Sequence, residues 1–135
     1  MYLIVVGASP EGNRFVDKAT EQSHEVTLIE PNEQRARQML KENSIRVLHG
    51  AIADDDILQE AEVDRADAVI AATHDDSTNL MAMVLAKECK VETRISLVNQ
   101  RSHVQMFEQL GVKVVSDPAG IVADQLCEHL SGSRQ

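Results

Sequence analysis

The chain has 135 residues and a formal net charge of -9 at pH 7, with 22 acidic and 13 basic side chains. That length fits one domain with a single core, and the negative charge argues against binding to nucleic acid or anionic lipid. The apolar runs are much shorter than the roughly 20 residues that span a bilayer, so we expect a soluble protein with no direct membrane insertion.

Six short apolar runs alternate with segments of helical periodicity, a pattern typical of parallel sheets built from βαβ units. Each run is continuous, as expected for strands that are buried on both faces. Residues 1–116 are therefore predicted to form an α/β domain, a Rossmann-like doubly wound parallel sheet of about six strands. The expected strands are residues 3–6, 26–29, 46–48, 68–71, 94–98 and 113–115, and the expected helices are 11–22, 32–43, 54–63, 75–89 and 102–111, the last ending at Gly111.

Residues 117–135 have a different pattern. Asp117 and Pro118 predict the start of a C-terminal helix, and apolar residues follow at helical spacing. This stripe needs a covering surface, which is either the chain's own sheet or a second copy that the helix crosses to. The stripe consists of Ala119, Val122, Ala123, Leu126, Cys127 and Leu130, and we expect a disordered tail beyond it.

The turn after the first strand, GASPEG at residues 7–12, matches the dinucleotide-binding pattern G-x-G-x-x-G only at its first and third glycines. Gly7 suits the tight turn, and Gly12 lets the next helix lie close to the sheet. Ser9 crowds the pyrophosphate position, although its hydroxyl could donate to a phosphate oxygen. Pro10 lacks an amide N–H, and Glu11 adds a negative charge. Ser9 as N-cap before Pro10 also makes a helix start that needs no ligand, so the loop alone leaves phosphate binding open.

Glu30 stands at the tip of the second expected strand, directly after residue 29, at the sheet edge where open α/β folds bind ligands. A carboxylate at this position accepts both ribose hydroxyls of an adenosine and repels a 2′-phosphate. The alternative is that Glu30 caps the next helix, although Asn32 would cap that helix well by itself.

A polar cluster follows the fourth expected strand, at the same edge of the sheet. It consists of Thr73, His74, Asp75 and Asp76. Helix capping explains Asp75 and Asp76 well and Thr73 less well, so Thr73 favours a ligand site.

The chain resembles the TrkA N-terminal family, whose RCK-type domains regulate potassium conductance. Four segments from Leu3 to Leu126 carry the resemblance: VVGASPEG, SHEVTLIEPNEQRARQM, VLHGAIADDDILQEAEVDRADAVIAATHDDSTNLMAMVLAKE and SLVNQRSHVQMFEQLGVKVVSDP. The third follows the family order G-D-A-T-D, A-D-A and T-x-D-D-x-x-N, with Gly50, Asp54, Ala66, Asp67, Ala68, Thr73, Asp75, Asp76 and Asn79 in place.

The resemblance implies a cytosolic regulatory domain of a potassium transport system, in which a bound nucleotide controls a membrane channel or transporter subunit through conformation. It implies NAD(H), ATP, ADP or AMP as ligand, a homodimer or higher oligomer, and a cytoplasmic location, peripheral to the membrane through the partner. The partner would be another polypeptide or another part of a longer protein. The expected nucleotide site comprises Gly7, Ala8, Ser9, Pro10, Glu11, Gly12, Glu30, Pro31, Asn32, Arg35, Gly50, Ala51, Ile52, Ala72, Thr73, His74 and Asn79.

Three positions depart from the family pattern on the ligand side. Ser9 replaces a glycine, Ala51 replaces an aspartate, and Leu97 stands where a basic residue often lies near the phosphates. Arg35 or Arg94 would have to supply the missing positive charge. A degenerate assembly domain without ligand therefore remains an alternative.

A small NAD-dependent oxidoreductase is the alternative from another functional class. The only tyrosine, Tyr2, lies inside the first strand, which excludes a Tyr-Lys acid/base pair, and no nucleophile elbow or P-loop is present. The five histidines have no metal-binding spacing, and Cys89 and Cys127 stand far apart, as is typical of reduced thiols. We expect no enzymatic activity, no catalytic residue and no metal site.

Overall fold

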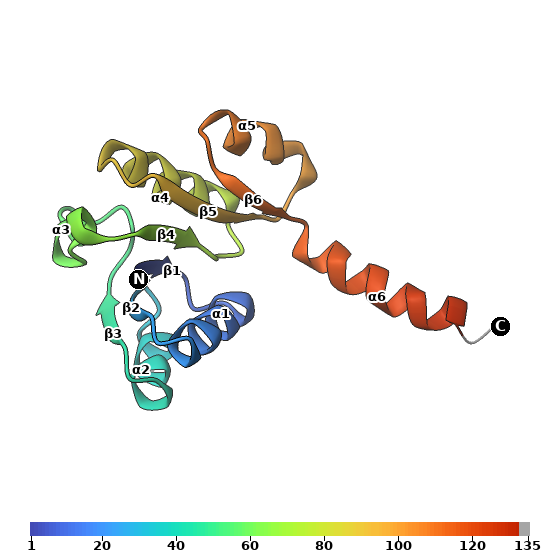
Figure 1. Ribbon diagram of the computed structural model, residues 1–135, viewed down its shortest axis with the longest axis horizontal. Helices are drawn as coiled ribbons and strands as arrows, with labels where there is room; N and C mark the ends of the chain where they lie inside the picture. Colours follow the sequence, from blue (N-terminus) through green and yellow to red (C-terminus); the bar gives the residue numbers. More distant parts are fainter. Residues whose placement is uncertain (133–135) are drawn as a thin grey trace.

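A six-stranded parallel sheet with the order β3-β2-β1-β4-β5-β6 forms the centre of the protein (Figure 1). The computed structural model describes residues 1–132. The chain reverses its winding between β1 and β4, which confirms the predicted doubly wound sheet, and each expected strand lies within an observed one. The strands are β1 (Tyr2–Val6), β2 (Glu25–Glu30), β3 (Arg46–His49), β4 (Ala68–Ala71), β5 (Thr93–Val98) and β6 (Lys113–Ser116).

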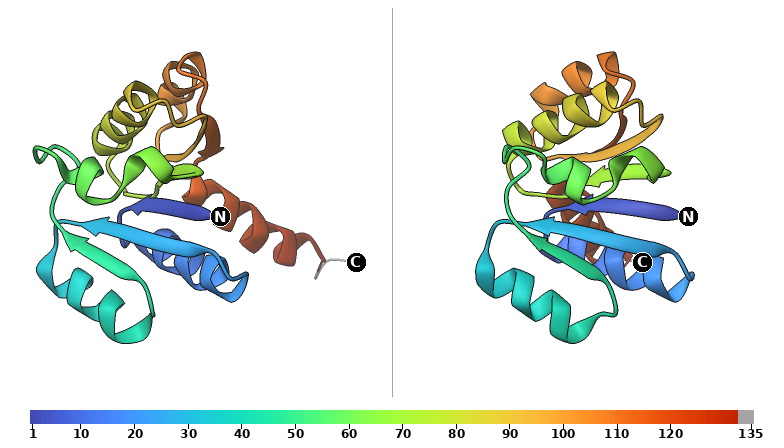
Figure 2. Two further views of the ribbon diagram at one scale, coloured as in Figure 1. Left: turned by 60° about the vertical axis from the view of Figure 1, so that its left-hand side comes forward. Right: turned by 90° about the vertical axis from the view of Figure 1, so that its left-hand side faces the viewer.

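Helices cover both faces of the sheet (Figure 2). Successive residues of β1 point to opposite faces: Leu3 and Val5 pack with α1 (Pro10–Glu21) and α2 (Glu33–Glu42). Ile4 and Val6 pack on the other face, with α4 (Asp76–Glu88) and Phe107 of α5 (Val104–Gln109). This alternation gives the domain two apolar layers, one on each side of the central strands.

The helix predicted at 54–63 is wrong over most of its length. The structure has the short helix α3 (Ile57–Glu60), followed by the 3-10 turn η1 (Val63–Arg65). Asp56 and Glu62 have φ of 62° and 58°, and a left-handed residue cannot continue a right-handed helix. The helix predicted at 102–111 begins as the 3-10 turn η2 (Arg101–His103) and continues as α5. Gly111, with φ of 78°, ends it as predicted.

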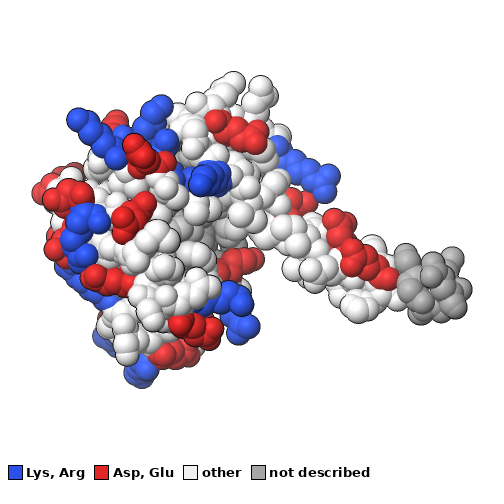
Figure 3. Space-filling view, viewed as in Figure 1, with Lys and Arg blue, Asp and Glu red and all other residues white. Residues whose placement is uncertain are grey.

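The C-terminal helix α6 (Pro118–Gly132) leaves the edge of the sheet directly after β6 and extends away from the body (Figures 1 and 2). All its residues from 121 to 130 are exposed, so the described part of the chain does not pack this helix on its own sheet. In Figure 3 its acidic side chains gather on one side and uncharged atoms cover the other. The predicted disordered tail falls on residues 133–135, which lie outside the described part of the chain. Among residues 1–132, no helix combines the length and apolar character needed to cross a membrane.

Candidate functional site

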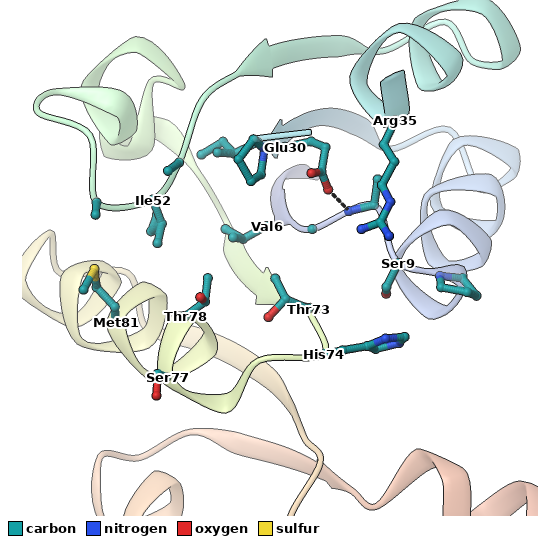
Figure 4. A pocket seen from close by; sticks show the side chains of 17 residues that line it. Val6, Ser9, Glu30, Arg35, Ile52, Thr73, His74, Ser77, Thr78 and Met81 are labelled. Carbon is teal, nitrogen blue, oxygen red and sulfur yellow. Dashed lines mark hydrogen bonds between the residues drawn. The ribbon is translucent and has the colours of Figure 1, made fainter. Parts of the chain in front are cut away.

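A cavity of about 440 Å³ opens at the carboxyl ends of β1, β2 and β4, next to the point where the winding reverses (Figure 4). This is the position where open α/β sheets bind ligands. Most of the predicted site residues line it, namely Gly7, Ala8, Ser9, Pro10, Glu30, Pro31, Arg35, Ala51, Ile52, Thr73 and His74. The other predicted residues, Glu11, Gly12, Asn32, Gly50, Ala72 and Asn79, do not line it but hold the residues that do.

The two glycines of the loop have the structural roles predicted for them. Gly7 has φ of 105°, and a Cβ there would meet Thr73 Cγ2 at 2.6 Å. A Cβ on Gly12 would collide with the carbonyl oxygen of Gly7. Both positions therefore need glycine for the turn out of β1 and for the close approach of α1 to the sheet.

The start of α1 is satisfied by groups of the protein itself. Ser9 is the N-cap, its Oγ accepts a hydrogen bond from the Gly12 amide at 3.1 Å, and Pro10 occupies the first helical position. The Ser9 hydroxyl donates its proton to the Ala72 carbonyl, so in this arrangement that proton is not directed at the cavity, and its donation to a phosphate stays a prediction. The Ala8 amide is also used, because it donates to Glu30. The loop offers few free donors to an anion.

Glu11 joins α1 to the loop after β4. Its Oε2 lies 2.9 Å from Nε2 of His74, and both side chains are exposed. The hydrogen bond with His74 lowers the pKa of the Glu11 carboxyl; partial burial opposes this, and the backbone amide of Glu11 itself adds a smaller lowering effect. Glu11 is thus held as a carboxylate in the first turn of α1, where the helix dipole favours negative charge.

Glu30 is the charged residue most firmly fixed in the cavity. Its side chain is buried, with 3% of the residue exposed. Oε1 accepts from the Ala8 amide and Oε2 from the Asn32 amide, both at 2.7 Å. Asn32 itself caps α2 by accepting from the Arg35 amide at 3.0 Å. Glu30 is therefore not needed as the helix cap, and its carboxylate is oriented by two amides that come from different sides of the cavity.

Of the described residues that line the cavity, Arg35 is the only lysine or arginine. Figure 4 shows its guanidinium directed toward the loop near Ser9. Arg94, the other predicted source of positive charge, lies elsewhere: its Nε donates to the Val91 carbonyl and its Nη1 to the Leu110 carbonyl. Leu97 does not line the cavity either.

The loop after β4 is fixed by Asn79, which is fully buried. Asn79 Oδ1 accepts from the amide and the hydroxyl of Thr73, and its Nδ2 donates to the carbonyls of Thr73 and Leu97. Thr73 also accepts from the Asp75 amide at 3.1 Å. The threonine and the asparagine of the T-x-D-D-x-x-N motif thus shape the cavity wall, and only the threonine faces the cavity.

The two aspartates of this motif differ in role. Asp75 caps α4 as predicted, by accepting from the Ser77 amide. Asp76 was predicted as a second capping residue, but its carboxylate instead accepts from the amides of Asn99 and Gln100 and lies 2.7 Å from Nδ1 of His103. Burial raises the pKa of Asp76, and these hydrogen bonds outweigh it, so that the pKa is lowered. Asp76 ties the start of α4 to the loop after β5.

Six residues of the wall were missed by the sequence analysis. Val6 is the last residue of β1 and Ile29 the last but one of β2, and both could have been found from their neighbours in the motifs. Ser77, Thr78 and Met81 follow His74 at the spacing of one helix face, which is the signal for a wall made by α4. The complete missed set is Val6, Ile29, Ala53, Ser77, Thr78 and Met81. Among residues 1–132, no three His, Cys, Asp or Glu side chains are grouped to hold a metal ion.

Comparison with known proteins assigns the family. The model of the TrkA-N domain matches residues 3–118. The chain is 29% identical over 126 residues to a Trk system potassium uptake protein TrkA homolog of Methanothermobacter thermautotrophicus, covering 93% of the chain and 58% of that protein. It is 32% identical over 130 residues to the Trk system potassium uptake protein TrkA of Vibrio alginolyticus, covering 95% of the chain and 28% of that protein. The chain thus spans less than two thirds of these curated relatives.

Solved structures share the fold at lower identity. The TrkA-N domain of the inner membrane protein ybaL from Escherichia coli superposes with a TM-score of 0.83 at 18% identity, over 96% of both chains. A Kef C-terminal domain of Shewanella denitrificans in AMP-bound form gives 0.82 at 16% identity, over 97% of this chain and 80% of that one. The GsuK channel bound to NAD superposes with a TM-score of 0.75 at 20% identity, over 84% of this chain and 21% of that one. The family match over residues 3–118 shows that the chain belongs to the TrkA-N domain family.

Proposed function

We propose that this chain is a regulatory domain of a potassium transport system and that its cavity binds an adenine nucleotide. The observation that carries the proposal is Glu30, a buried carboxylate fixed by two amides at the carboxyl end of β2. The names of the TrkA relatives support the transport system, and the AMP-bound and NAD-bound relatives of this fold support the ligand class.

The fit to a nucleotide is best at the ribose. Each oxygen of Glu30 accepts one amide and keeps acceptor capacity for one hydroxyl, so the carboxylate suits a vicinal diol. A 2′-phosphate would bring a second anion against this carboxylate, which argues against NADP(H). Ile52 and Met81 offer apolar surface to a base, and Arg35 offers positive charge to a phosphate. NAD(H), ATP, ADP and AMP share these features.

The ligand class is tested by thermal unfolding of the purified chain with NAD⁺, NADH, NADP⁺, ATP, ADP, AMP and adenosine at millimolar concentration. A ligand at about 100 times its Kd adds about 2.7 kcal/mol to the free energy of unfolding, which is a readily measured shift. We expect a shift with at least one adenine ligand that has a free ribose and none with NADP⁺. No shift with any of them, for a folded sample, would leave the domain with an assembly role only.

We further propose that the domain works as a dimer or larger assembly through α6. Val122 and Leu126 are 59% and 65% exposed, and both lie on the apolar stripe of a helix that extends from the body. A second copy would cover this stripe, and a change in the cavity would then alter the angle between paired domains and reach a membrane partner. The domain acts in this proposal from the cytoplasmic side, by binding and not by turnover.

The assembly is tested by light scattering coupled to size exclusion. We expect Leu126→Glu to lower the mass of the wild-type assembly, because a carboxylate in a buried apolar contact costs several kcal/mol. Gln125→Glu adds the same charge to another side of the same helix and is the matched control. A monomeric wild-type chain at high concentration, or equal masses for the two variants, would contradict this interface.

A further inference from the structure

Two side chains that can carry positive charge approach the loop at Ser9, Arg35 on one side and His74 on the other (Figure 4). Their states differ. Among the described residues, the guanidinium of Arg35 has no hydrogen-bond or ion-pair partner. The imidazole of His74 is already paired, since its Nε2 lies 2.9 Å from Oε2 of Glu11. The end of the cavity at Ser9 therefore has one uncommitted cation and one imidazole held by an internal carboxylate.

The backbone adds little to this positive charge. A phosphate at a helix N-terminus is held by the first free amides of the helix. Here Pro10 has no amide proton, the Gly12 amide donates to Ser9, and the Ala8 amide donates to Glu30. Glu11 moreover places its own negative charge in the first turn, the position that a ligand anion would otherwise take.

We propose that Glu11 limits the number of phosphates that the cavity accepts. By holding His74, it leaves Arg35 as the partner of one phosphate, and the cavity is therefore matched to a nucleoside monophosphate. A second phosphate would lie near the Glu11 carboxylate without a cation of its own. One unit charge a few ångströms away in a solvated site changes affinity by about five-fold. This inference rests on the proposed nucleotide site and specifies which ligand that site selects.

The test is the ratio of affinities for AMP and ADP, measured by isothermal titration calorimetry at fixed ionic strength, with adenosine as the uncharged reference. For the wild type we expect AMP to bind about five-fold or more tightly than ADP, ATP or NAD⁺. Glu11→Gln should tighten ADP and narrow this ratio by about five-fold, with no change for adenosine. Glu21→Gln, at the other end of α1, removes the same charge far from the cavity and should leave the ratio unchanged.

A second variant keeps the test valid if Glu11→Gln does not fold. His74→Gln removes the imidazole and leaves Glu11 unpaired, so the preference for AMP over ADP should widen. The inference is overturned if the wild type binds ADP as tightly as AMP, or if neither variant moves the ratio while folding normally. If adenosine binds but AMP is not preferred over ADP, this inference alone is overturned and the proposed nucleotide site stands. Binding of none of these ligands would overturn the proposed nucleotide site together with it.

Discussion

The two ends of the cavity use their polar groups in opposite ways. At the β2 end, Glu30 is oriented by two amides and keeps acceptor capacity toward the cavity. At the α1 end, the Ser9 hydroxyl bonds within the protein on both its donor and acceptor sides, and Glu11 is paired with His74. Building the turn and binding a pyrophosphate are thus separable tasks of this loop. The glycines that build the turn are present, whereas the Ser9 hydroxyl and the amides of Ala8 and Gly12 already bond within the protein.

The largest effect is expected from Glu30→Gln, which breaks the β2 end. A glutamine keeps one acceptor oxygen but turns its NH₂ group toward a buried amide donor. We expect the free energy of unfolding to fall by about 2 to 3 kcal/mol and nucleotide binding to be lost. Urea unfolding and calorimetry measure the two effects. Glu92→Gln, on the surface, is the control and should change neither; an unaltered Glu30→Gln variant would show that this carboxylate is not part of a site.

Asp76→Asn tests whether the carboxylate of Asp76 stabilises the protein by tying the start of α4 to the loop after β5. We expect a loss of about 2 kcal/mol at pH 7, because hydrogen bonds to a charged group are lost. The folded-state pKa of Asp76 is lowered, so its contribution to stability is present above the unfolded pKa of about 4 and is lost as the pH falls through the folded value. Urea unfolding at decreasing pH should show the difference between wild type and variant shrinking once the pH falls below about 4. The surface variant Asp64→Asn should show no such pH-dependent difference, and a gap that persists in acid would contradict the role given to this charge.

A smaller effect is expected from Ser9→Ala, which removes the cap at the α1 end. The loss should be about 1 kcal/mol, the usual cost of a serine N-cap, and Ser9→Gly should cost less at the cap itself. Thermal unfolding compares the three proteins. If the hydroxyl served a phosphate instead of the helix, Ser9→Ala would weaken ligand binding without any loss of stability.

The smallest effect on stability is expected from Arg35→Gln, which removes the one lysine or arginine among the described residues that line the cavity. Its guanidinium has no partner among the described residues, so the free energy of unfolding should stay within about 0.5 kcal/mol of wild type. AMP affinity should nevertheless fall several-fold, with adenosine affinity unchanged. Arg37→Gln, two residues further along α2 and outside the cavity lining, removes the same charge from another side of the helix and is the control. Equal AMP binding by wild type and Arg35→Gln would remove Arg35 from the site.

The sequence predicted the sheet because its signal is local. Each strand is a short continuous apolar run, and each observed strand contains the expected residues. The prediction of a helix at 54–63 was wrong because Asp56 and Glu62 adopt the left-handed conformation and interrupt it. A glycine at either position would have indicated that conformation, but aspartate and glutamate do not. Helix capping was read correctly at Ser9, Asn32 and Asp75, where the acceptor and its amide lie within three residues.

The part of the cavity that was predicted also depends on local sequence signals. Glu30 and Thr73 were found because they stand at strand ends, which topology brings together. The role of Asp76 was missed because its partners, Asn99 and Gln100, are more than 20 residues away in sequence. Met81 was missed because the rotation of α4 about its axis decides which of its faces lines the cavity, and this rotation is set by packing on the sheet. The pairing of Glu11 with His74 joins the first turn of α1 to a loop 63 residues away in sequence, so no local pattern predicts it.

The way in which α6 leaves the sheet has a mechanical consequence. Asp117 sits between β6 and α6, with its amide bound to the Val98 carbonyl and its carboxylate bound to the Gly120 amide and to Arg101. The base of the helix is therefore clamped to the sheet. A helix of 15 residues is about 22 Å long, so a tilt of about 10° at this clamp moves its far end by about 4 Å. A movement of the sheet edge too small to change the fold is in this way enlarged into a displacement of several ångströms at the far end of α6.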